Sequence, residues 1–377
     1  MSPTPLHDST AASIDEASAD DIHWEQRWQP LRREWVVIAA HRQNRPWSGQ
    51  NDRIQERDRR EHDPTCYLCP GVVRASGAIN PPYTDTLVFD NDFPCVGPAA
   101  PPRPARRGAG PYRTGRADGL ARVVCYSPRH DLSLAELGVA GVDRLLVTWQ
   151  EQWRELSARP EVNHLLFFEN RGEQVGVSNP HPHCQIYATN FVFKTIANEA
   201  VYAAEHHRET GRSLLGDMIE REMRDADRLL HASPSAVAFV PHCARYPYET
   251  FVAPRRCVPN IAALDKPERQ ALAEALSETL IRFDNLWQTP FPYVMALHQA
   301  PCDGRDHPGF HFHIEFHPPL RKPDLLKFPA GPEIGGGNFI SDTWPEDKAE
   351  ELRLVPTLHH RHTKRSTGAS AELEGSA

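Results

Sequence analysis

The stretch SNPHPHCQIYA, residues 178–188, carries an unusual alternation of side chains. His181 and His183 lie two residues apart around Pro182, and Gln185 continues the spacing. Residues i and i+2 of a β-strand point to the same face, so we expect these three polar side chains on one side. A polar stripe on a buried face is costly without partners. The pattern therefore favours a metal or catalytic site, and the polar face of an edge strand, where proline is tolerated, is the alternative.

Two cysteines upstream offer ligands for a metal. Cys66 and Cys69 form a CxxC pair, which can place two thiolates on one tetrahedral zinc. His130, in SPRH, and His181 are candidates for the two remaining ligands. A redox pair would normally open a helix in a βαβ context, and none is evident upstream. Two core cysteines at this spacing by chance remain the simpler alternative.

A second histidine alternation lies near the other end of the chain. His311 and His313 form an HxH pair, His317 continues the alternation, and Glu315 lies between them. Together with His298 and a carboxylate, such a pair could hold a second metal. A half-exposed polar strand is again the alternative.

Composition limits the classes of function. The chain has 377 residues, 40% of them hydrophobic, and a formal charge of −8. No stretch is both basic and aromatic enough to suggest a nucleic-acid groove, so we expect no nucleic-acid partner. No apolar run reaches the ~18 residues of a membrane-spanning helix, and residues 1–22 lack the basic start and apolar region of a secretory signal. We therefore expect a cytoplasmic protein. Of the eight cysteines only Cys66 and Cys69 are closely paired, which predicts no disulfide framework.

Residues 122–156 and 249–287 follow the same order: a strand, a Pro–basic turn, a short loop and an amphipathic helix. Each helix is followed by an apolar strand, at 164–172 and 293–301, and then by a histidine-alternating strand, with an offset of about 126–128 residues. We interpret this as a duplicated α+β unit with a mostly antiparallel sheet and flanking helices, against the alternative of two unrelated helices between strands. The expected helix faces are Val142, Leu145, Leu146, Trp149, Trp153 and Leu156, and Leu272, Leu276, Leu280, Phe283 and Trp287.

This interpretation divides the chain into an N-terminal half, residues 23–200, and a C-terminal half, residues 201–355. We expect disordered tails at residues 1–22 and 356–377, which lack apolar periodicity. The Pro-, Gly- and Arg-rich segment 98–119 is expected to be a long surface loop.

With these motifs in order, the chain resembles the galactose-1-phosphate uridylyltransferases, a branch of the histidine-triad superfamily, over most of residues 23–355. The matching segments are RREWVVIAAHRQNRPW (32–47), CYLCPG (66–71), YTDTLVFDNDFP (83–94), CYSPRHDLSLAEL (125–137), FFENRGEQVGVSNPHPHCQ (167–185) and FHFHIEFHPPLRK (310–322).

The resemblance implies an enzyme that transfers UMP from UDP-glucose to a hexose 1-phosphate, galactose 1-phosphate above all, through a covalent uridylyl-histidine. It implies His183 as the nucleophile and Gln185 as the residue that hydrogen-bonds the phosphate. It implies zinc on Cys66, Cys69, His130 and His181, and iron or zinc on Glu199, His298, His311 and His313, with Glu199 preferred to Ala203 because no insertion is needed. The substrate contacts that it implies are Arg42, Arg45, Asn91, Asp92, Asn170, Ser178, Asn179, Lys327, Phe328 and Glu333.

Some residues depart from the family pattern. Gln185 stands where a third histidine is common in the wider superfamily, and an amide cannot act as acid or base, which favours transfer over hydrolysis. Ala330 and Pro332 replace a frequent valine and tyrosine, and Phe339 replaces a glutamine, which leaves the acceptor sugar open. The resemblance also implies a homodimer with the site between subunits.

Two other classes of function remain as alternatives. A related nucleotide-sugar phosphorylase, for example one acting on an ADP-sugar, would use phosphate as the acceptor. A non-catalytic zinc-stabilised binding protein would be expected to lack His183 or Gln185, and both are present.

Overall fold

The structure, a computed structural model, describes residues 23–44, 60–98 and 110–362. Its five α-helices are α1 (Gly138–Ser157), α2 (Lys194–Thr210), α3 (Leu214–Asp225), α4 (Lys266–Leu286) and α5 (Pro345–Leu354). The strands are β1 (Glu25–Gln29), β2 (Glu34–Ile38), β3 (Leu87–Asp90), β4 (Gly119–Cys125), β5 (His164–Arg171), β6 (His183–Thr189), β7 (Leu229–Ala232), β8 (Ala236–Phe239), β9 (Thr250–Pro254), β10 (Tyr293–His298), β11 (His313–His317), β12 (Leu320–Lys322), β13 (Leu325–Leu326) and β14 (Ile340–Ser341).

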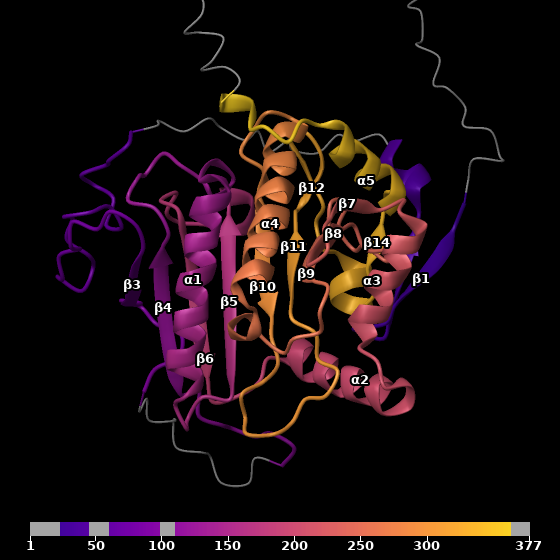
Figure 1. Ribbon diagram of the computed structural model, residues 1–377, viewed down its shortest axis with the longest axis horizontal. Coiled ribbons are helices and arrows are strands. Elements are labelled where there is room, and N and C mark those ends of the chain that lie inside the picture. The colour runs from indigo at the N-terminus through magenta and orange to yellow at the C-terminus, as the bar shows by residue number, and fades with distance from the viewer. Residues whose placement is uncertain (1–22, 45–59, 99–109, 363–377) are drawn as a thin grey trace, which may run out of the picture.

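A nine-stranded sheet forms the centre of the molecule (Figure 1). Its strand order is β3-β4-β6-β5-β10-β11-β9-β8-β7, and every neighbouring pair is antiparallel. Apart from β7, the order is symmetric about the β5–β10 pair, as expected of two copies of one unit. The α+β architecture with a mostly antiparallel sheet, predicted from the sequence, is confirmed.

Helices α1 and α4 lie side by side against this sheet (Figure 1). The face predicted for α1 is buried, with Trp149 fully enclosed and Trp153 partly buried. The face predicted for α4 is buried too, from Leu272 to Phe283, and Trp287 packs at its C-terminal end. The Asp265 side chain caps α4 by accepting a hydrogen bond from the Glu268 backbone N–H, and the Glu268 side chain accepts one from the Asp265 backbone N–H.

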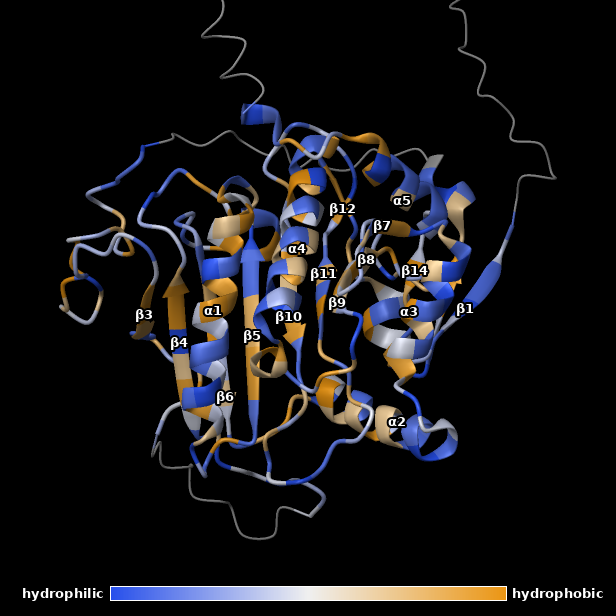
Figure 2. Cartoon of the chain, viewed as in Figure 1, coloured by the Kyte–Doolittle hydropathy of each residue, from blue (hydrophilic) through white to orange (hydrophobic). Residues whose placement is uncertain are grey.

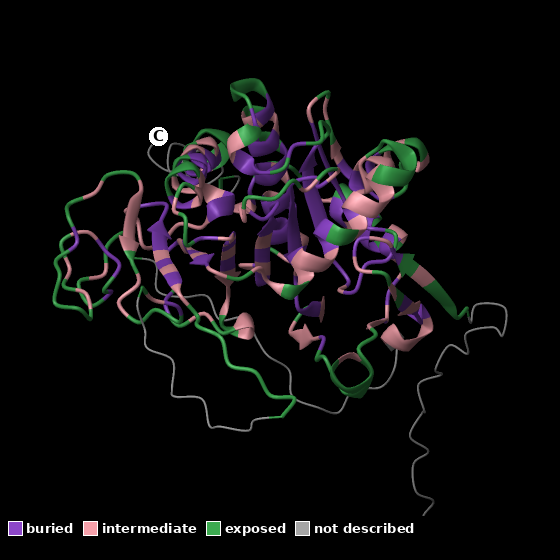
Figure 3. Cartoon of the chain, turned by 90° about the horizontal axis from the view of Figure 1, so that it is seen from below, coloured by how far each residue is buried: buried purple, intermediate pink, exposed green. Residues whose placement is uncertain are grey.

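Hydrophobic residues run along the central strands and in bands on α1 and α4 (Figure 2). One apolar cluster contains residues of both predicted halves, from Val124 and Phe167 to Leu280 and Phe316. Figure 3 shows the same strands as the buried interior, with exposed residues on the outer helices and loops. Because the core is shared, the two halves form one packed unit.

The predicted boundaries need two corrections. The division between residues 200 and 201 falls inside α2, so it does not separate two structural elements. The C-terminal tail was predicted to begin at residue 356, but His359 is fully buried and contacts Asp284 at 3.2 Å. The side chain of Asn285 also donates to the carbonyls of Pro356 and Leu358. Tertiary contacts with α4 therefore order residues 356–362 without any apolar periodicity of their own.

Several expectations lie wholly or partly outside the described residues: the N-terminal tail 1–22, the tail beyond residue 362, and residues 99–109 of the predicted loop. Residues 110–117 of that loop are exposed. Among the helices that the structure describes, none has both the length and the apolar character needed to cross a membrane.

A small second sheet joins distant segments of the chain. Strands β1 and β2 form an antiparallel hairpin, and β14 adds to β2 in parallel. This sheet places β14, which follows the predicted sugar contacts Lys327, Phe328 and Glu333 in the chain, next to the N-terminal hairpin.

Candidate active site and metal clusters

His183 is the first residue of β6, and its ring orientation is set by the backbone. Nδ1 donates to the carbonyl oxygen of His181 at 2.8 Å. The need for such an acceptor was predicted from the sequence, and the contact confirms it. With the proton on Nδ1, the Nε2 lone pair is free to act as a nucleophile. Burial lowers the pKa of His183 below its usual value, which keeps the ring neutral near pH 7.

The expectation that three side chains share one strand face needs a correction. The strand begins at His183, so only His183 and Gln185 follow its alternation, and both are half-buried. His181 precedes the strand and is 1% exposed. Pro182 lies between the two environments and cannot donate a ladder hydrogen bond, so the chain there turns His181 toward the cysteine pair.

Gln185 has an amide whose oxygen faces protein donors. Asn91 Nδ2 lies 3.4 Å and the Tyr187 hydroxyl 3.5 Å from Gln185 Oε1. Both contacts are long, but they direct the oxygen toward these donors and leave the NH₂ group for an acceptor such as a phosphate oxygen. The structure thus brings predicted residue Asn91 beside predicted residue Gln185.

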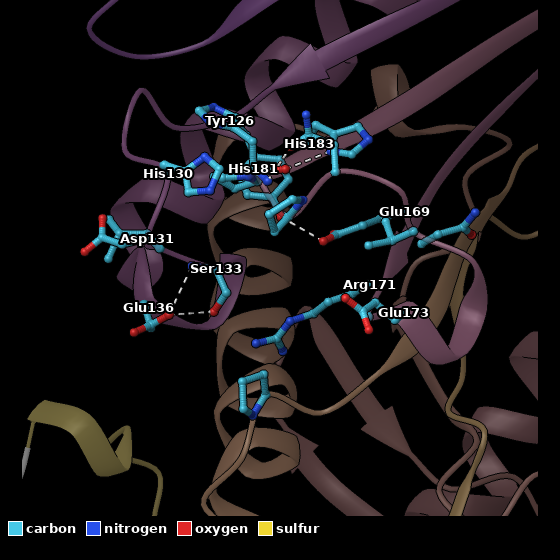
Figure 4. Close-up of a pocket in the computed structure, with 18 of the residues that line it drawn as sticks. Tyr126, His130, Asp131, Ser133, Glu136, Glu169, Arg171, Glu173, His181 and His183 are labelled. Carbon is cyan, nitrogen blue, oxygen red and sulfur yellow. Dashed lines mark hydrogen bonds between the residues drawn. The ribbon is translucent and has the colours of Figure 1, made fainter. Parts of the chain in front are cut away.

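A cavity of about 390 Å³ opens beside the nucleophile, and predicted residues Asn170, Asn179, His181 and His183 line it. Figure 4 shows His130, His181 and His183 on one side of this cavity and Glu169, Arg171 and Glu173 on another. Ser178 is exposed and does not line it. Asn179 is 6% exposed, and its side-chain oxygen accepts from the His181 backbone at 2.9 Å, which indicates a site-shaping role.

Glu169 is a cavity residue that the sequence reasoning missed. It is 3% exposed and accepts a hydrogen bond from the Tyr126 hydroxyl at 2.7 Å. Burial raises the pKa of its carboxyl to about 7. The backbone N–H of Tyr126 donates to the carbonyl of Pro182 at 3.3 Å, so this buried pair touches the segment between the two histidines. The position of a glutamate next to Asn170 in an otherwise apolar strand was the feature of the sequence that could have indicated a site residue.

The four residues predicted to hold zinc come together. Ligand atoms of Cys66, Cys69, His130 and His181 all lie within 4.8 Å of one another. Cys69 Sγ is 3.6 Å from His130 Nδ1 and 3.5 Å from His181 Nδ1. The opposite nitrogen of His181 contacts the Ser127 carbonyl at 3.0 Å and the Tyr83 hydroxyl at 2.8 Å.

These contacts fit a tetrahedral zinc centre. A proton on His181 Nε2, held by the Ser127 carbonyl, leaves Nδ1 unprotonated toward the sulfur atoms, as a metal ligand requires. Burial raises the pKa of the Cys69 thiol to about 11, so a bound cation would be needed to hold it as thiolate. Tyr83 is an additional partner of the cluster that the sequence reasoning did not include.

The second cluster differs from the prediction at one residue. Glu199, His298 and His313 come together as predicted, but the fourth member is Glu315 and not His311. The His311 ring is engaged elsewhere, with Nε2 2.8 Å from the Pro254 carbonyl and Nδ1 3.1 Å from the Ser213 hydroxyl. Because β11 begins at His313, the alternation that faces the cluster continues to Glu315 rather than back to His311. Ala203, the rejected alternative to Glu199, is not a member.

Equivalent contacts relate the two histidine pairs. His313 Nδ1 lies 2.9 Å from the His311 carbonyl, as His183 Nδ1 does from the His181 carbonyl at 2.8 Å. The counterpart of His183 is therefore His313, and the counterpart of Gln185 is Glu315. The sequence offset of 126–128 residues had paired His183 with His311 or a neighbour.

The remaining predicted contacts do not reach the cavity. Asp92 accepts from the Ser76 backbone at 3.1 Å, and Arg42 lies 3.9 Å from Asp342. Lys327 Nζ is 3.4 Å from Glu333 Oε1. Phe328, which follows Lys327, is 55% exposed. The described cavity wall includes none of these five residues, nor Asn91 or Gln185, and Arg45 lies outside the described part of the chain.

Comparison with known proteins identifies the family. The N-terminal domain model of galactose-1-phosphate uridyl transferase matches residues 15–192, and the C-terminal domain model matches residues 196–365. The chain is 35% identical to the galactose-1-phosphate uridylyltransferase of Haemophilus influenzae, over 90% of this chain and 96% of that one. It is 36% identical to that of Rattus norvegicus, over 93% of this chain and 92% of the relative. The chain belongs to the galactose-1-phosphate uridylyltransferase family.

Solved structures agree with this family assignment. A uridylyltransferase structure matches with a TM-score of 0.69 and 29% identity, over 87% of this chain and 97% of that one. An ADP-glucose phosphorylase from Arabidopsis thaliana matches with a TM-score of 0.70 but only 22% identity, over 89% of this chain and 99% of that one. The second match shows a shared fold alone. The family is one of nucleotidyltransferase enzymes, in line with the enzyme class predicted from the sequence.

Proposed function

We propose that this chain transfers UMP from UDP-glucose to galactose 1-phosphate through a uridylyl group on His183. The observation that carries the proposal is the 2.8 Å contact between His183 Nδ1 and the His181 carbonyl, which leaves Nε2 as the nucleophilic atom at the cavity. Family membership and the relatives' names support the same activity.

The proposed transfer consists of two successive displacements at the α-phosphorus. In the first, Nε2 attacks the α-phosphorus of UDP-glucose, a P–N bond forms, and the P–O bond breaks with its electrons leaving on glucose 1-phosphate. In the second, a phosphate oxygen of galactose 1-phosphate attacks the same phosphorus, and the P–N bond breaks to restore neutral imidazole. The Gln185 amide donates to the phosphate oxygens in both steps and cannot activate water, since it is neither acid nor base.

A labelling experiment tests the nucleophile. After incubation with UDP-glucose labelled in the uridine, the protein should carry acid-labile, base-stable label, and His183→Ala should carry none. His307→Ala is a matched control, because it removes an imidazole that pairs with Asp303 rather than lining the cavity. Label on the His183→Ala protein would overturn the assignment.

A panel of sugar phosphates and nucleotides tests the acceptor and the base. We expect galactose 1-phosphate to discharge the labelled protein fastest among hexose 1-phosphates. Discharge by inorganic phosphate, with adenine preferred to uracil, would instead indicate a nucleotide-sugar phosphorylase. That alternative has less support, because the solved ADP-glucose phosphorylase shares only the fold.

We further propose two metal centres for this enzyme. The cysteine cluster suits zinc, with Cys66, Cys69, His130 and His181 as ligands in a structural role that fixes the chain before β6. The second cluster, with Glu199, His298, His313 and Glu315, offers two imidazoles and two carboxylates, which suit iron or zinc. Metal analysis of the purified protein should find up to two equivalents, and the absence of zinc would contradict the first assignment.

We also propose a homodimer in which Lys327, Phe328 and Glu333 of one subunit complete the site of the other. Two observations support it: these residues do not line the cavity of their own chain, and the β1–β2 hairpin exposes Trp28 and Trp35, at 40% and 45%. A complementation experiment is a direct test. Inactive His183→Ala and Lys327→Ala proteins, refolded or co-expressed together, should regain partial activity, because a mixed dimer has one intact site. A site contained in one chain would give no recovery.

A further inference from the structure

Arg32 contacts the carboxylates of the second cluster from the turn between β1 and β2. Its Nη2 lies 2.6 Å from Glu315 Oε2 and 3.9 Å from Glu199 Oε1. Its Nη1 lies 3.3 Å from the Thr195 hydroxyl at the start of α2. The Arg32 side chain is 13% exposed, and both carboxylates are buried, at 0% and 3%. A single cation therefore spans the two acidic members of the proposed metal site.

The two oxygens of Glu315 have different surroundings. Oε2 is also 3.5 Å from Arg245 Nη2, 3.2 Å from His317 Nε2 and 3.4 Å from His298 Nε2. Oε1 faces His313 Nε2 at 3.4 Å. Arg245 is already committed to Glu249, which it contacts at 2.7 Å, and no contact joins it to Glu199 in the described structure. Among the described residues, Arg32 is the guanidinium that contacts both carboxylates of the cluster. The His298 imidazole also contacts both, with Nδ1 2.8 Å from Glu199 Oε2, but it is itself a member of the proposed metal site.

Buried carboxylates need a compensating charge. Two ionised carboxylates in a dry site are strongly unfavourable unless a cation or a metal ion is close. With Arg32 in place, the cluster holds its positive charge without metal, and a divalent ion would enter a site that already contains a cation, against Coulomb repulsion.

We propose that Arg32 is a built-in counter-cation of the second cluster, which keeps this part of the fold stable without metal and weakens metal binding there. It is a positioning residue that acts through Glu315 and Glu199. The inference rests on the second metal site of the proposed function, but not on the transfer reaction.

Thermal unfolding of chelator-treated protein gives the first test. Arg32→Met should lower the Tm of the chelated protein by roughly 4–6 °C, the shift expected for breaking a buried ion pair in a protein of this size. Arg33→Met is the matched control, because Arg33 is the next residue, is 43% exposed and pairs with Glu205 on the surface. We expect the control to change the Tm by no more than ~2 °C. Equal Tm values for the two chelated variants would overturn the proposal.

Adding Zn²⁺ alone gives the second test. Zinc should raise the Tm of Arg32→Met more than that of the unmodified protein. Removing the second equivalent of zinc from Arg32→Met should need at least ~10-fold more chelator than removing it from the unmodified protein. If Arg32→Met bound the second equivalent more weakly than the unmodified protein does, Arg32 would support metal binding, and the proposal would be overturned.

A double variant covers the case in which Arg32→Met does not fold. Arg32→Met with Glu315→Gln removes both charges of the closest pair and should recover at least half of the lost Tm. No recovery would contradict the role of Arg32. Labelling of His183 is measured in parallel, and its failure would count against the proposed transfer while leaving the Arg32 result intact.

Discussion

Gln185 is the side chain to which the proposed mechanism assigns the contact with the phosphate. Its amide oxygen faces the Asn91 amide and the Tyr187 hydroxyl, so its NH₂ group is the part available to a phosphate oxygen. Such a donor stabilises developing charge without giving water a proton. His183 beside it stays neutral because burial lowers its pKa.

Replacing Gln185 tests this donor. We expect Gln185→Ala to lower the kcat/KM of UMP transfer by roughly 10²–10³-fold, the usual effect of losing one donor to a developing negative charge. Tyr187→Phe removes only the hydroxyl that orients the amide and should have a much smaller effect. Steady-state kinetics of both variants check this, and equal losses would contradict a direct role for the amide.

Glu169 predicts a pH dependence of stability. Burial raises the pKa of this carboxyl to about 7, above its unfolded value, so the folded protein binds a proton that the unfolded chain releases near pH 4.5. Its contribution is therefore fully present at low pH and is lost as the pH rises from about 4.5 to 7, by roughly 3 kcal/mol. Glu169→Gln, which cannot ionise, should flatten the fall in Tm across this range.

Unfolding curves between pH 4.5 and 8 check this prediction. Glu173→Gln is a suitable control, because Glu173 is an exposed glutamate on the rim of the same cavity. An unchanged pH profile for Glu169→Gln would show that Glu169 ionises at its ordinary pKa.

The segment before β6 depends on the cysteine cluster for its position. His181 belongs to that cluster, while its own carbonyl orients the nucleophile. A change in the proposed metal ligands should therefore reach His183 through two residues of backbone. Tyr83 and Asn179 add hydrogen bonds to the same segment.

Removal of one cysteine ligand tests the zinc assignment. Cys69→Ser should lose one equivalent of zinc and lower the Tm by roughly 3–5 °C, the range for losing a tightly bound ligand in a chain of this length. Cys95→Ser changes an exposed cysteine outside the cluster and should alter neither. Metal analysis and thermal unfolding of the two proteins measure the difference, and full zinc content in Cys69→Ser would exclude this ligand set.

The whole molecule is organised around the seam between β5 and β10. Phe167 lies opposite Leu297 across this seam, and both are fully buried in the core that the two halves share. A continuous sheet and a shared core predict cooperative unfolding of both halves.

Phe167→Ala should lower the stability of the entire protein by about 3–5 kcal/mol, with a single transition by calorimetry and circular dichroism. Val139→Ala, at a 41% exposed position of α1, should change it by less than ~0.5 kcal/mol. Two separate transitions in the Phe167→Ala protein would mean that the halves unfold independently.

The sequence by itself determined the elements and much of the site. Periodicity predicted the buried faces of α1 and α4, because a helix or strand buries residues at a fixed repeat. The cysteine pair could be recognised from its spacing, because CxxC is typical of zinc ligands, whereas the resemblance to the family assigned His130 and His181 to the same site. The acceptor for His183 Nδ1 could be predicted because the backbone carbonyl two residues earlier lies within reach.

Only the tertiary structure decided which strand positions face which neighbours. Glu315 rather than His311 joins the second cluster because β11 begins at His313, and the register with β10 places His313 opposite His298. Arg32 is almost three hundred residues from Glu315 in sequence, so no local pattern could predict their contact. Chain order shows periodicity within an element, whereas packing between distant elements fixes the partners of each side chain.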